Sequence, residues 1–400
     1  MILTDKIGNG QVKKLPSGAA IFQLDSYKEN PVVKPQDIGL IWEEDGKQKI
    51  GAVFNGGAEI YDNRIVLLPR CHHHYRKATF FDQPLGRERT CLENYISEVW
   101  VLISDDGIHF DRYDDIVIRG DGSDHQDFLY GIEDIRIIRY PDYYLLVGCG
   151  KIKPPFKGSN ADRTAIYSTT DFQNITYQGM ISAFDGRNTV PFPEPIHGTL
   201  FTFLRFHPNI HLAPLEGGIE QFLYPKKYQN SWEKIYNERA KNLFIQSGMF
   251  PHEKEKVGPG TQIIKTEEGW LFIYHAVGEI GEEICQAYGL TGRIERGYSI
   301  SAALLDLDNP QKIIARTRKP IYIPHHPYEL YGTEEKLTEK EYADQKEKYP
   351  VDVPAVVFPV GAVTIQDKLL IYAGAGDKYT VLLGCHINDL LDYLLTYCKI

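Results

Sequence analysis

Short aromatic and aliphatic runs that follow turn residues recur along the chain. Five of them are DNRIVLLPR from Asp62, PDYYLLVGCG from Pro141, HGTLFTFLRF from His197, EGWLFIYHAV from Glu268 and QDKLLIYAGA from Gln366. Runs of this length and composition, opened by Asp or Gly turn chemistry, are typical of β-strands. Each run ends in small or polar residues, as strands do where they reach a central opening. The pattern predicts an irregular fivefold repeat.

A second strand-like run often follows within the same repeat, as in 100–110, 165–172 and 298–310. One repeat therefore holds several antiparallel strands. The copies are longer than the roughly 40–50 residues of a propeller blade, and we attribute the excess to insertions at about 72–97, 224–252 and 324–352. The sequence predicts an all-β fold: a single five-bladed β-propeller domain over residues 1–400, with loop insertions.

Helical signals are few. Thr338 with Glu341 forms a capping box that opens a charged stretch to Lys348, and Ser231 can cap a helix over 232–243. The segment NDLLDYLLTYC at 388–398 has helical apolar spacing. We expect a short C-terminal helix there.

Composition narrows the class of function. The 44 basic and 54 acidic residues give a net charge of −10, which argues against a general binder of nucleic acid or anionic membrane. The six cysteines are dispersed without a C-x-x-C pair, as in a cytoplasmic protein with reduced thiols. No run approaches eighteen apolar residues, and the N-terminus lacks a signal-peptide core. We expect a cytoplasmic protein without a membrane span.

The heptapeptide GIEDIRI at 131–137 sets two acids and an arginine among apolar residues at the opening of a strand. Strand alternation predicts that Asp134 and Arg136 share a face. Asp134 is the first candidate for acid chemistry. The alternative is a structural aspartate that backbone amides or Arg136 satisfy.

Cationic residues form a second candidate cluster, and two of them end the recurring runs. They are Arg187, Arg205, Lys256 and His275. Cations that meet from different blades repel one another unless an anion or carboxylates lie between them, so a phosphate-sized anion is a reasonable guest. The alternative is that they pair with Asp134, Glu194 and Asp377.

Three adjacent histidines, His72, His73 and His74, invite a metal hypothesis. On a strand only His72 and His74 can share a face, and no carboxylate spacing such as H-E-x-x-H accompanies them. We therefore expect no metal site.

Several long motifs, in order, resemble glycoside hydrolase family 130, the β-mannoside phosphorylases and β-mannosidases, which are five-bladed β-propellers. VFNGGA at 53–58 resembles the family's F-N-x-G-A, GIEDIRI its G-x-E-D-P-R-I, and FPEPIHG at 192–198 its F-P-E-K-I-N-G. KVGPGTQIIKTEEGWLFIYHAV at 256–277 is similar to another family stretch, as are SAALLDLDNPQKIIAR and the closing VVFPVGAV with IYAGAGD. Ile135 replaces the family's proline.

The resemblance implies roles for individual residues. Asp134 would be the catalytic acid, and phosphate would be held by Arg187, Arg205, Lys256, His275 and Asn55. Substrate contacts are expected from Arg70, Glu133, Arg136, Asn188, Glu194 and Asp377. Inorganic phosphate would be a co-substrate, with no cofactor and no metal. The partners would be an oligosaccharide and phosphate, and a homo-oligomer is compatible with the rim insertions.

The expected function is an inverting phosphorylase that splits a β-1,2- or β-1,4-linked mannoside with phosphate into α-D-mannose 1-phosphate and a free sugar. An inverting hydrolase needs a carboxylate base to activate water, whereas phosphate is already anionic and needs cations to position it. The first alternative is a β-mannosidase with Glu194 or Glu253 as base. The second is a non-catalytic carbohydrate-binding propeller. The only hint of it is Ile135 in place of the family's proline.

Overall fold

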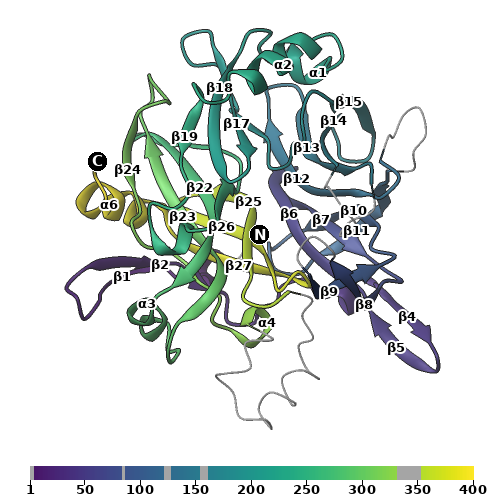
Figure 1. The fold of residues 1–400 in the computed structure, drawn as a ribbon, viewed down its shortest axis with the longest axis horizontal. Helices are drawn as coiled ribbons and strands as arrows, with labels where there is room; N and C mark the ends of the chain where they lie inside the picture. Colours follow the sequence, from purple (N-terminus) through teal and green to yellow (C-terminus); the bar gives the residue numbers. More distant parts are fainter. Residues whose placement is uncertain (1–3, 83–85, 121–127, 154–160, 331–352) are drawn as a thin grey trace.

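The computed structural model describes residues 4–82, 86–120, 128–153, 161–330 and 353–400. Five antiparallel sheets surround a common centre as the blades of a β-propeller (Figure 1). The predicted all-β, five-bladed fold is confirmed.

Each blade is named in chain order, with its innermost strand first. Blade 1 contains β6 (Ala52–Tyr61), β7 (Arg64–His72), β10 (Ser97–Ser104) and β11 (Asp111–Ile118). Blade 2 contains β12 (Ile132–Arg139), β13 (Tyr144–Lys151), β14 (Asp162–Thr169) and β15 (Ile175–Ile181). Blade 3 contains β16 (Val190–Pro191), β17 (Leu200–Phe206), β18 (Asn209–Leu215) and β19 (Leu243–Ile245).

The remaining blades depart slightly from this plan. Blade 4 contains β20 (Lys256–Pro259), β22 (Trp270–Ile280), β23 (Ile294–Leu305) and β24 (Ile313–Arg316), and β21 (Ile264–Lys265) also pairs with β22. Blade 5 contains β25 (Val357–Ile365), β26 (Lys368–Ala375), β27 (Tyr379–His386) and β3 (Asp25–Ser26). All five recurring runs of the sequence are therefore the second strands of their blades: β7, β13, β17, β22 and β26.

The fifth blade closes the ring with a strand from the beginning of the chain. In the pairing of β3 with β27, Ser26 lies opposite Leu383. The Asn30 side chain adds two bonds to the backbone of Leu382, donating to its carbonyl and accepting from its amide, both at 2.8 Å. Residues more than 350 positions apart thus complete one sheet.

At the propeller axis the inner strands pack backbone against backbone. A Cβ atom at Gly57 of β6 would lie 2.3 Å from the carbonyl oxygen of Ile135 in β12. One at Gly361 of β25 would lie 2.3 Å from the amide nitrogen of Ala58. Glycine is required at both positions because any side chain would separate the strands.

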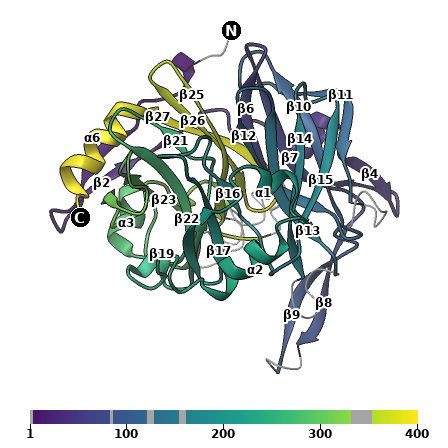
Figure 2. The ribbon, with the colours of Figure 1, turned by 90° about the horizontal axis from the view of Figure 1, so that it is seen from above.

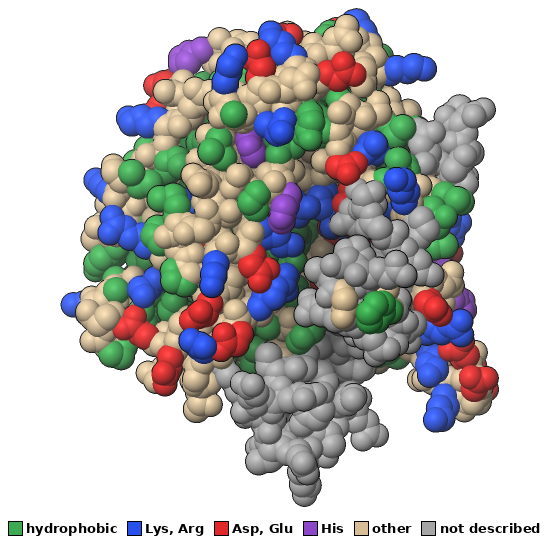
Figure 3. Space-filling view, in the orientation of Figure 1, with side chains coloured by type: hydrophobic (Ala, Val, Ile, Leu, Met, Phe, Trp, Pro, Cys, Tyr) green, Lys and Arg blue, Asp and Glu red, His purple; other side chains and the backbone are tan. Residues whose placement is uncertain are grey.

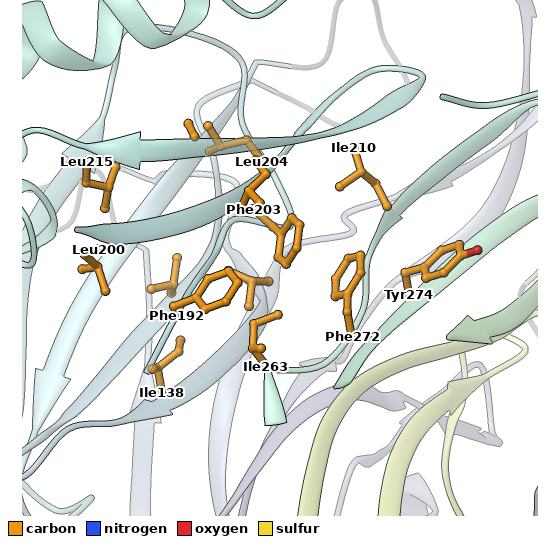
Figure 4. Packing of buried hydrophobic residues seen from close by; sticks show 14 of the residues in the cluster. Ile138, Phe192, Leu200, Phe203, Leu204, Ile210, Leu215, Ile263, Phe272 and Tyr274 are labelled. Atoms are coloured by element: carbon orange, nitrogen blue, oxygen red, sulfur yellow. The ribbon is translucent and has the colours of Figure 1, made fainter. Parts of the chain in front are cut away.

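Hydrophobic side chains fill the space between blades. Phe203 of β17 stacks on Phe272 of β22 with ring centroids 4.1 Å apart and an interplanar angle of 12°. Figure 4 shows these two rings among aliphatic side chains from β12, β17 and β18. Offset aromatic pairs of this kind stabilise a core beyond the area that they bury. They hold blades 3 and 4 in a fixed relation.

Other elements decorate this core. They are the hairpins β1 (Gln11–Lys14)–β2 (Ala20–Gln23), β4 (Ile41–Glu44)–β5 (Lys47–Ile50) and β8 (Arg76–Asp82)–β9 (Arg87–Glu93), the helices α1 (Glu220–Leu223), α2 (Gln229–Asn237), α3 (Glu282–Ala287), α4 (Pro327–Leu330) and α6 (Ile387–Tyr397), and 3-10 turns at Thr4–Lys6, Pro35–Ile38 and Pro251–Glu253. The β8–β9 hairpin forms the insertion predicted at 72–97 and projects from the propeller (Figure 2).

The helical predictions have mixed outcomes. The C-terminal helix is confirmed as α6 (Ile387–Tyr397). The helix expected over 232–243 is α2, which begins earlier and ends at Asn237, so Ser231 lies inside it and bonds Glu216 at 3.3 Å instead of capping. The helix expected from Thr338 to Lys348, and most of the insertion at 324–352, lie outside the described residues. In the described ranges, no helix is long and apolar enough to span a membrane.

Candidate active site

Charged side chains gather at the end of the propeller where the second strands finish. Arg70 lies near the end of β7, Lys151 ends β13, Arg205 lies near the end of β17, and the polar His275 lies in the middle of β22. Asp377 follows β26 and acts electrostatically on Arg70 and Tyr298. Lys and Arg side chains are visible in the hollowed middle of the face in Figure 3.

Asn55 and Asp134 occupy equivalent positions in blades 1 and 2. Each is the first residue of a bulge in the inner strand, with left-handed φ values of 53° and 56°. Asn and Asp adopt this conformation more readily than other non-glycine residues, and strained residues of this kind cluster at functional sites. The Asn55 Nδ2 donates to Asp134 Oδ1 at 2.9 Å, and Arg70 Nη1 lies 3.4 Å from the same oxygen. The structure therefore joins the predicted acid to two other predicted residues.

The bulge also changes the predicted relation of Asp134 to Arg136, because it interrupts strand alternation between Glu133 and Arg136. Ile135, the second bulge residue, is buried. A Cβ atom at Gly148 on β13 would meet the Ile135 side chain at 2.7 Å. Gly148 thus provides the room that Ile135 requires.

Arg136 holds neighbouring segments of the site together. Its guanidinium donates to the carbonyls of Gly260 (2.8 Å), Asp134 (2.8 Å) and Pro259 (3.2 Å). It also donates to Asn188 Oδ1 at 3.1 Å, which ties blades 2 and 4 to the segment before β16. The side chain is 1% exposed. Four of the five guanidinium N–H groups are used in these bonds. Arg136 therefore has one N–H group left for the predicted contact with the substrate.

Glu133 is the centre of a buried ion-pair network. Its carboxylate lies 2.9 Å from Arg70 Nη1 and 3.1 Å from Lys151 Nζ, and it also pairs with Arg187. Burial alone would raise the pKa of Glu133, but Arg70, Lys151 and Arg187 hold it below its usual range. Glu133 is therefore ionised and neutralises cations of the site.

Three predicted phosphate ligands converge around Gly258 in blade 4. A Cβ atom there would lie 2.4 Å from His275 Cε1 and 2.9 Å from Arg205 Cδ. Lys256, two residues earlier on β20, donates to the Tyr298 hydroxyl at 2.7 Å. Glycine at 258 allows His275 and Arg205 to approach each other.

The pKa values of Arg205, Lys256 and His275 are lowered by burial and by the positive charge of their neighbours. Burial and the neighbouring Arg187 lower the pKa of Arg205 to about 10. Burial and Arg205 lower the pKa of Lys256, and burial with Arg205 and Lys256 holds the pKa of His275 well below its ordinary value. His275 is therefore a neutral imidazole at neutral pH, beside two cations.

Several buried polar atoms at this end have no hydrogen-bond partner within the described part of the chain. They are Arg205 Nε, both ring nitrogens of His275, Asn188 Nδ2, Asn55 Oδ1 and Ser299 Oγ. Buried polar groups in proteins are normally paired, and each exception calls for an explanation. The arginine, amide and hydroxyl donors among these atoms, set among cations, suit a polar anion.

The two glutamates considered as a base lie elsewhere. Glu194 is exposed in the loop before β17, at the opposite end of the blade from Arg205, and pairs with Lys265 at 2.5 Å. Glu253 is fully buried and accepts hydrogen bonds from Tyr274 (2.8 Å) and Arg316 (2.5 Å). Tyr274 precedes His275 on β22, so the two side chains point to opposite faces. The structure brings neither glutamate to the cluster.

The histidine triplet separates as β7 ends. His72 is buried and stacks on Tyr95 with centroids 3.6 Å apart, whereas His74 is exposed with φ 54°. The predicted shared face of His72 and His74 is therefore wrong, because the strand ends at His72 and the left-handed residue turns the chain. Among the residues that the structure describes, no group of three or more His, Cys, Asp or Glu side chains could hold a metal.

Sequence reasoning missed Lys151, Asp162 and Tyr298. Lys151 Nζ lies 3.0 Å from Asp162 Oδ1, next to the Glu133 network. Lys151 directly follows one recurring run and Arg205 lies near the end of another, so the same signal could have identified Lys151. Asp162 opens β14 and Tyr298 lies within β23, and nothing in the local pattern distinguishes them.

Comparison with known proteins identifies the family. A family described as β-1,4-mannooligosaccharide phosphorylase, glycoside hydrolase family 130, matches residues 27–337. The chain belongs to this family. A β-1,2-mannobiose phosphorylase of Listeria innocua is 28% identical, covering 93% of this chain and 99% of the relative. A β-1,4-mannooligosaccharide phosphorylase of Ruminococcus albus is 26% identical, covering 76% and 78%.

Solved structures agree on the fold of this family 130 member. The Listeria innocua β-1,2-mannobiose phosphorylase, in complex with β-1,2-mannobiose, has a TM-score of 0.63 and 23% identity, and covers 93% of this chain and 99% of that one. A second structure comes from work showing that this family contains glycoside hydrolases that target β-1,2 mannosidic linkages in Candida mannan; it has a TM-score of 0.62 and 18% identity, with 94% and 96% coverage. Both reactions therefore occur on this fold, and the site must decide between them.

Proposed function

We propose that this chain is an inverting β-mannoside phosphorylase. The observation that carries the proposal is the cation cluster of Arg205, Lys256 and Arg187 beside neutral His275, with buried donors that lack partners among the described residues. Water would need a carboxylate base, whereas phosphate needs cations to hold it. Family membership and the names of the relatives support the same reaction.

Asp134 acts as the general acid in this proposal. A phosphate oxygen forms a bond to the anomeric carbon of the terminal mannosyl unit, and the bond from that carbon to the glycosidic oxygen breaks. The leaving oxygen receives the proton that Asp134 supplies, directly or through a hydroxyl of the sugar. The products are α-D-mannose 1-phosphate and a sugar with a free hydroxyl. The reaction balances with phosphate as the only co-substrate.

Neighbouring side chains have distinct roles. Asn55 holds Asp134 by its Nδ2 donor, and its Oδ1 is left for the ligand. Arg70 lies between Glu133 and Asp134, so it positions both carboxylates. Asn188 offers its Nδ2 to the ligand while Arg136 fixes its oxygen. Asp377 is proposed to contact the sugar.

We propose a β-1,2-linked mannoside as the first substrate to test. Relatives that match over 90% or more of this chain include β-1,2-mannobiose phosphorylases from Listeria innocua and Thermoanaerobacter sp. and a 1,2-β-oligomannan phosphorylase from Thermoanaerobacter sp.. The five cysteines whose side chains the structure describes are free and buried, which agrees with a reducing compartment. We propose the cytoplasm.

The deciding experiment incubates the protein with β-1,2- and β-1,4-mannobiose, each with and without inorganic phosphate. Phosphorolysis releases mannose 1-phosphate only when phosphate is present. Release of free mannose at the same rate in both buffers would instead establish a hydrolase. Arg187→Ala should weaken phosphate use far more than sugar binding, and equal losses in both would remove Arg187 from the phosphate site.

A further inference from the structure

Arg187 lies on a loop, and the start of β14 holds that loop in place. The amide of Gly186 donates to the carbonyl of Asp162 at 3.0 Å. On the other side of Arg187, the hydroxyls of Thr189 and Thr164 lie 2.9 Å apart. The loop backbone is thus fixed before and after Arg187, but these contacts leave the long arginine side chain free to rotate.

Two carboxylates fix the guanidinium itself. Arg187 Nη2 pairs with Glu133 Oε1, and Nε lies 3.2 Å from Asp162 Oδ2. The Nε contact is an ion pair, not a well-aligned hydrogen bond. Neither contact is made by Nη1. Together the carboxylates orient one edge of the guanidinium and leave Nη1 for a ligand.

Asp162 is itself held by Lys151, whose Nζ lies 3.0 Å from Asp162 Oδ1 and 3.1 Å from Glu133 Oε1. Lys151 therefore bridges the two carboxylates that grip Arg187. Burial alone would raise the pKa of Asp162, but Arg187 and Lys151 lower it below its usual range, so the carboxylate is ionised. Its side chain is only 8% exposed.

We propose that Asp162 is a positioning residue for phosphate: it orients the Arg187 guanidinium, and Lys151 holds Asp162 in place. The proposal rests on the proposed phosphorylase function. Asp162 acts through Arg187 and does not touch the reacting atoms. Its role is separate from that of Glu133, which also serves Arg70.

The proposal predicts an effect opposite to simple electrostatics. Removing a negative charge beside a cation cluster makes the site more positive, which by itself tightens the binding of an anion. If Asp162 positions Arg187, Asp162→Asn should instead weaken phosphate binding, because the guanidinium loses the partner that orients its Nε edge. The sign of the change therefore separates the two roles.

The test titrates inorganic phosphate into the full-length wild-type and Asp162→Asn proteins by calorimetry, and measures KM for phosphate and for the mannoside. We expect the Kd and KM for phosphate to rise about tenfold, because Arg187 would then form a less well oriented charge-assisted contact with phosphate, with the mannoside KM within about twofold. Unchanged or tighter phosphate binding would overturn the proposal. Equal losses for both substrates would also overturn it, because they would indicate a general structural role.

Asp185→Asn is the matched control. Asp185 is also an aspartate near Arg187, but it is exposed and pairs with Arg163. We expect its phosphate Kd to stay within about twofold of wild type. A loss as large as that of Asp162→Asn would assign the effect to local charge and contradict the positioning role.

Asp162→Glu covers the case in which the asparagine variant does not fold. It keeps the charge but moves the carboxylate by one methylene, so phosphate Kd should change while the mannoside KM does not. An unchanged phosphate Kd in a folded Asp162→Glu protein would overturn the proposal. Wild-type protein that binds no phosphate would refute the proposed function and this inference together, whereas wild-type binding that Asp162 substitutions leave intact would refute the inference alone.

Discussion

The two halves of the site differ in how their charges are balanced. On the side of blades 1 and 2, Arg70 and Lys151 each contact carboxylates at 2.9–3.4 Å. On the side of blades 3 and 4, Arg205 and Lys256 have pKa values lowered by burial and by neighbouring cations. The cations of the first half are already neutralised by carboxylates, whereas the cations of the second half are suited to binding an anion. In the proposed function the proton donor Asp134 thus lies on blade 2, whereas the phosphate ligands Arg205 and Lys256 lie on blades 3 and 4.

The largest expected effect concerns the acid. Asp134→Asn keeps the hydrogen bond to Asn55 in reach but removes the proton donor, so kcat should fall by about 10²–10⁴, the usual contribution of general acid catalysis. Steady-state phosphorolysis of mannobiose measures this. An aryl β-mannoside with a good leaving group should lose much less activity. Equal losses on both substrates would deny Asp134 the role of acid.

The next effect concerns stability and tests whether the phosphate side contains a base. Glu253→Gln leaves Arg316 without its buried carboxylate, which should cost about 3 kcal/mol of unfolding free energy, measured by denaturant unfolding. The kcat of the folded variant should stay unchanged. A large drop in kcat with unchanged stability would support the β-mannosidase alternative, with Glu253 as base. Glu194→Gln, on the surface, is the control and should change neither quantity.

Removal of one cation should separate the two halves directly. Arg205→Ala is expected to raise the KM for phosphate about 10- to 100-fold, because a charge-assisted contact is typically worth roughly 1.5–3 kcal/mol. The KM for the mannoside should change little. Initial rates over a grid of both substrate concentrations distinguish the two constants. Loss of sugar binding of the same size would show that the halves do not divide the substrates.

The smallest expected effect is a shift with pH. Burial and Arg205 lower the pKa of Lys256 below that of an ordinary lysine. Its charge is present at low pH and is lost as pH rises through this lowered pKa, so phosphate KM should rise several-fold toward alkaline pH. Lys256→Arg, which stays charged, should show a shallower rise. An identical pH profile for the two proteins would remove Lys256 from the phosphate site.

The sequence predicted the blades better than it predicted the ends of the strands. Each recurring run became the second strand of a blade because its apolar residues are buried between blades, and that periodicity is local. The same runs pointed to Arg205 and His275. Glu194 was expected at the site but lies at the opposite end of its blade from Arg205. The physical reason is that a pattern identifies a strand but not the end of the propeller on which an adjacent loop lies.

Other features of the site depend on contacts between distant residues. The bulges at Asn55 and Asp134 arise where inner strands pack at the axis, and alternation alone predicted a regular strand instead. The buried pair of Glu253 and Arg316 joins residues 63 positions apart. The network of Lys151 and Asp162 could be recognised only once β13 and β14 were side by side.

The bulges of blades 1 and 2 have the same backbone conformation but carry different side-chain chemistry. Asn55 and Asp134 share a left-handed conformation and nearly the same side-chain shape, and differ by an amide against a carboxyl group. An exchange of the two, Asn55→Asp with Asp134→Asn, would preserve their hydrogen bond while moving the proton donor by one blade. If Asp134 is the acid as proposed, its location around the propeller axis depends only on which of two equivalent bulges carries the carboxyl group and which carries the amide.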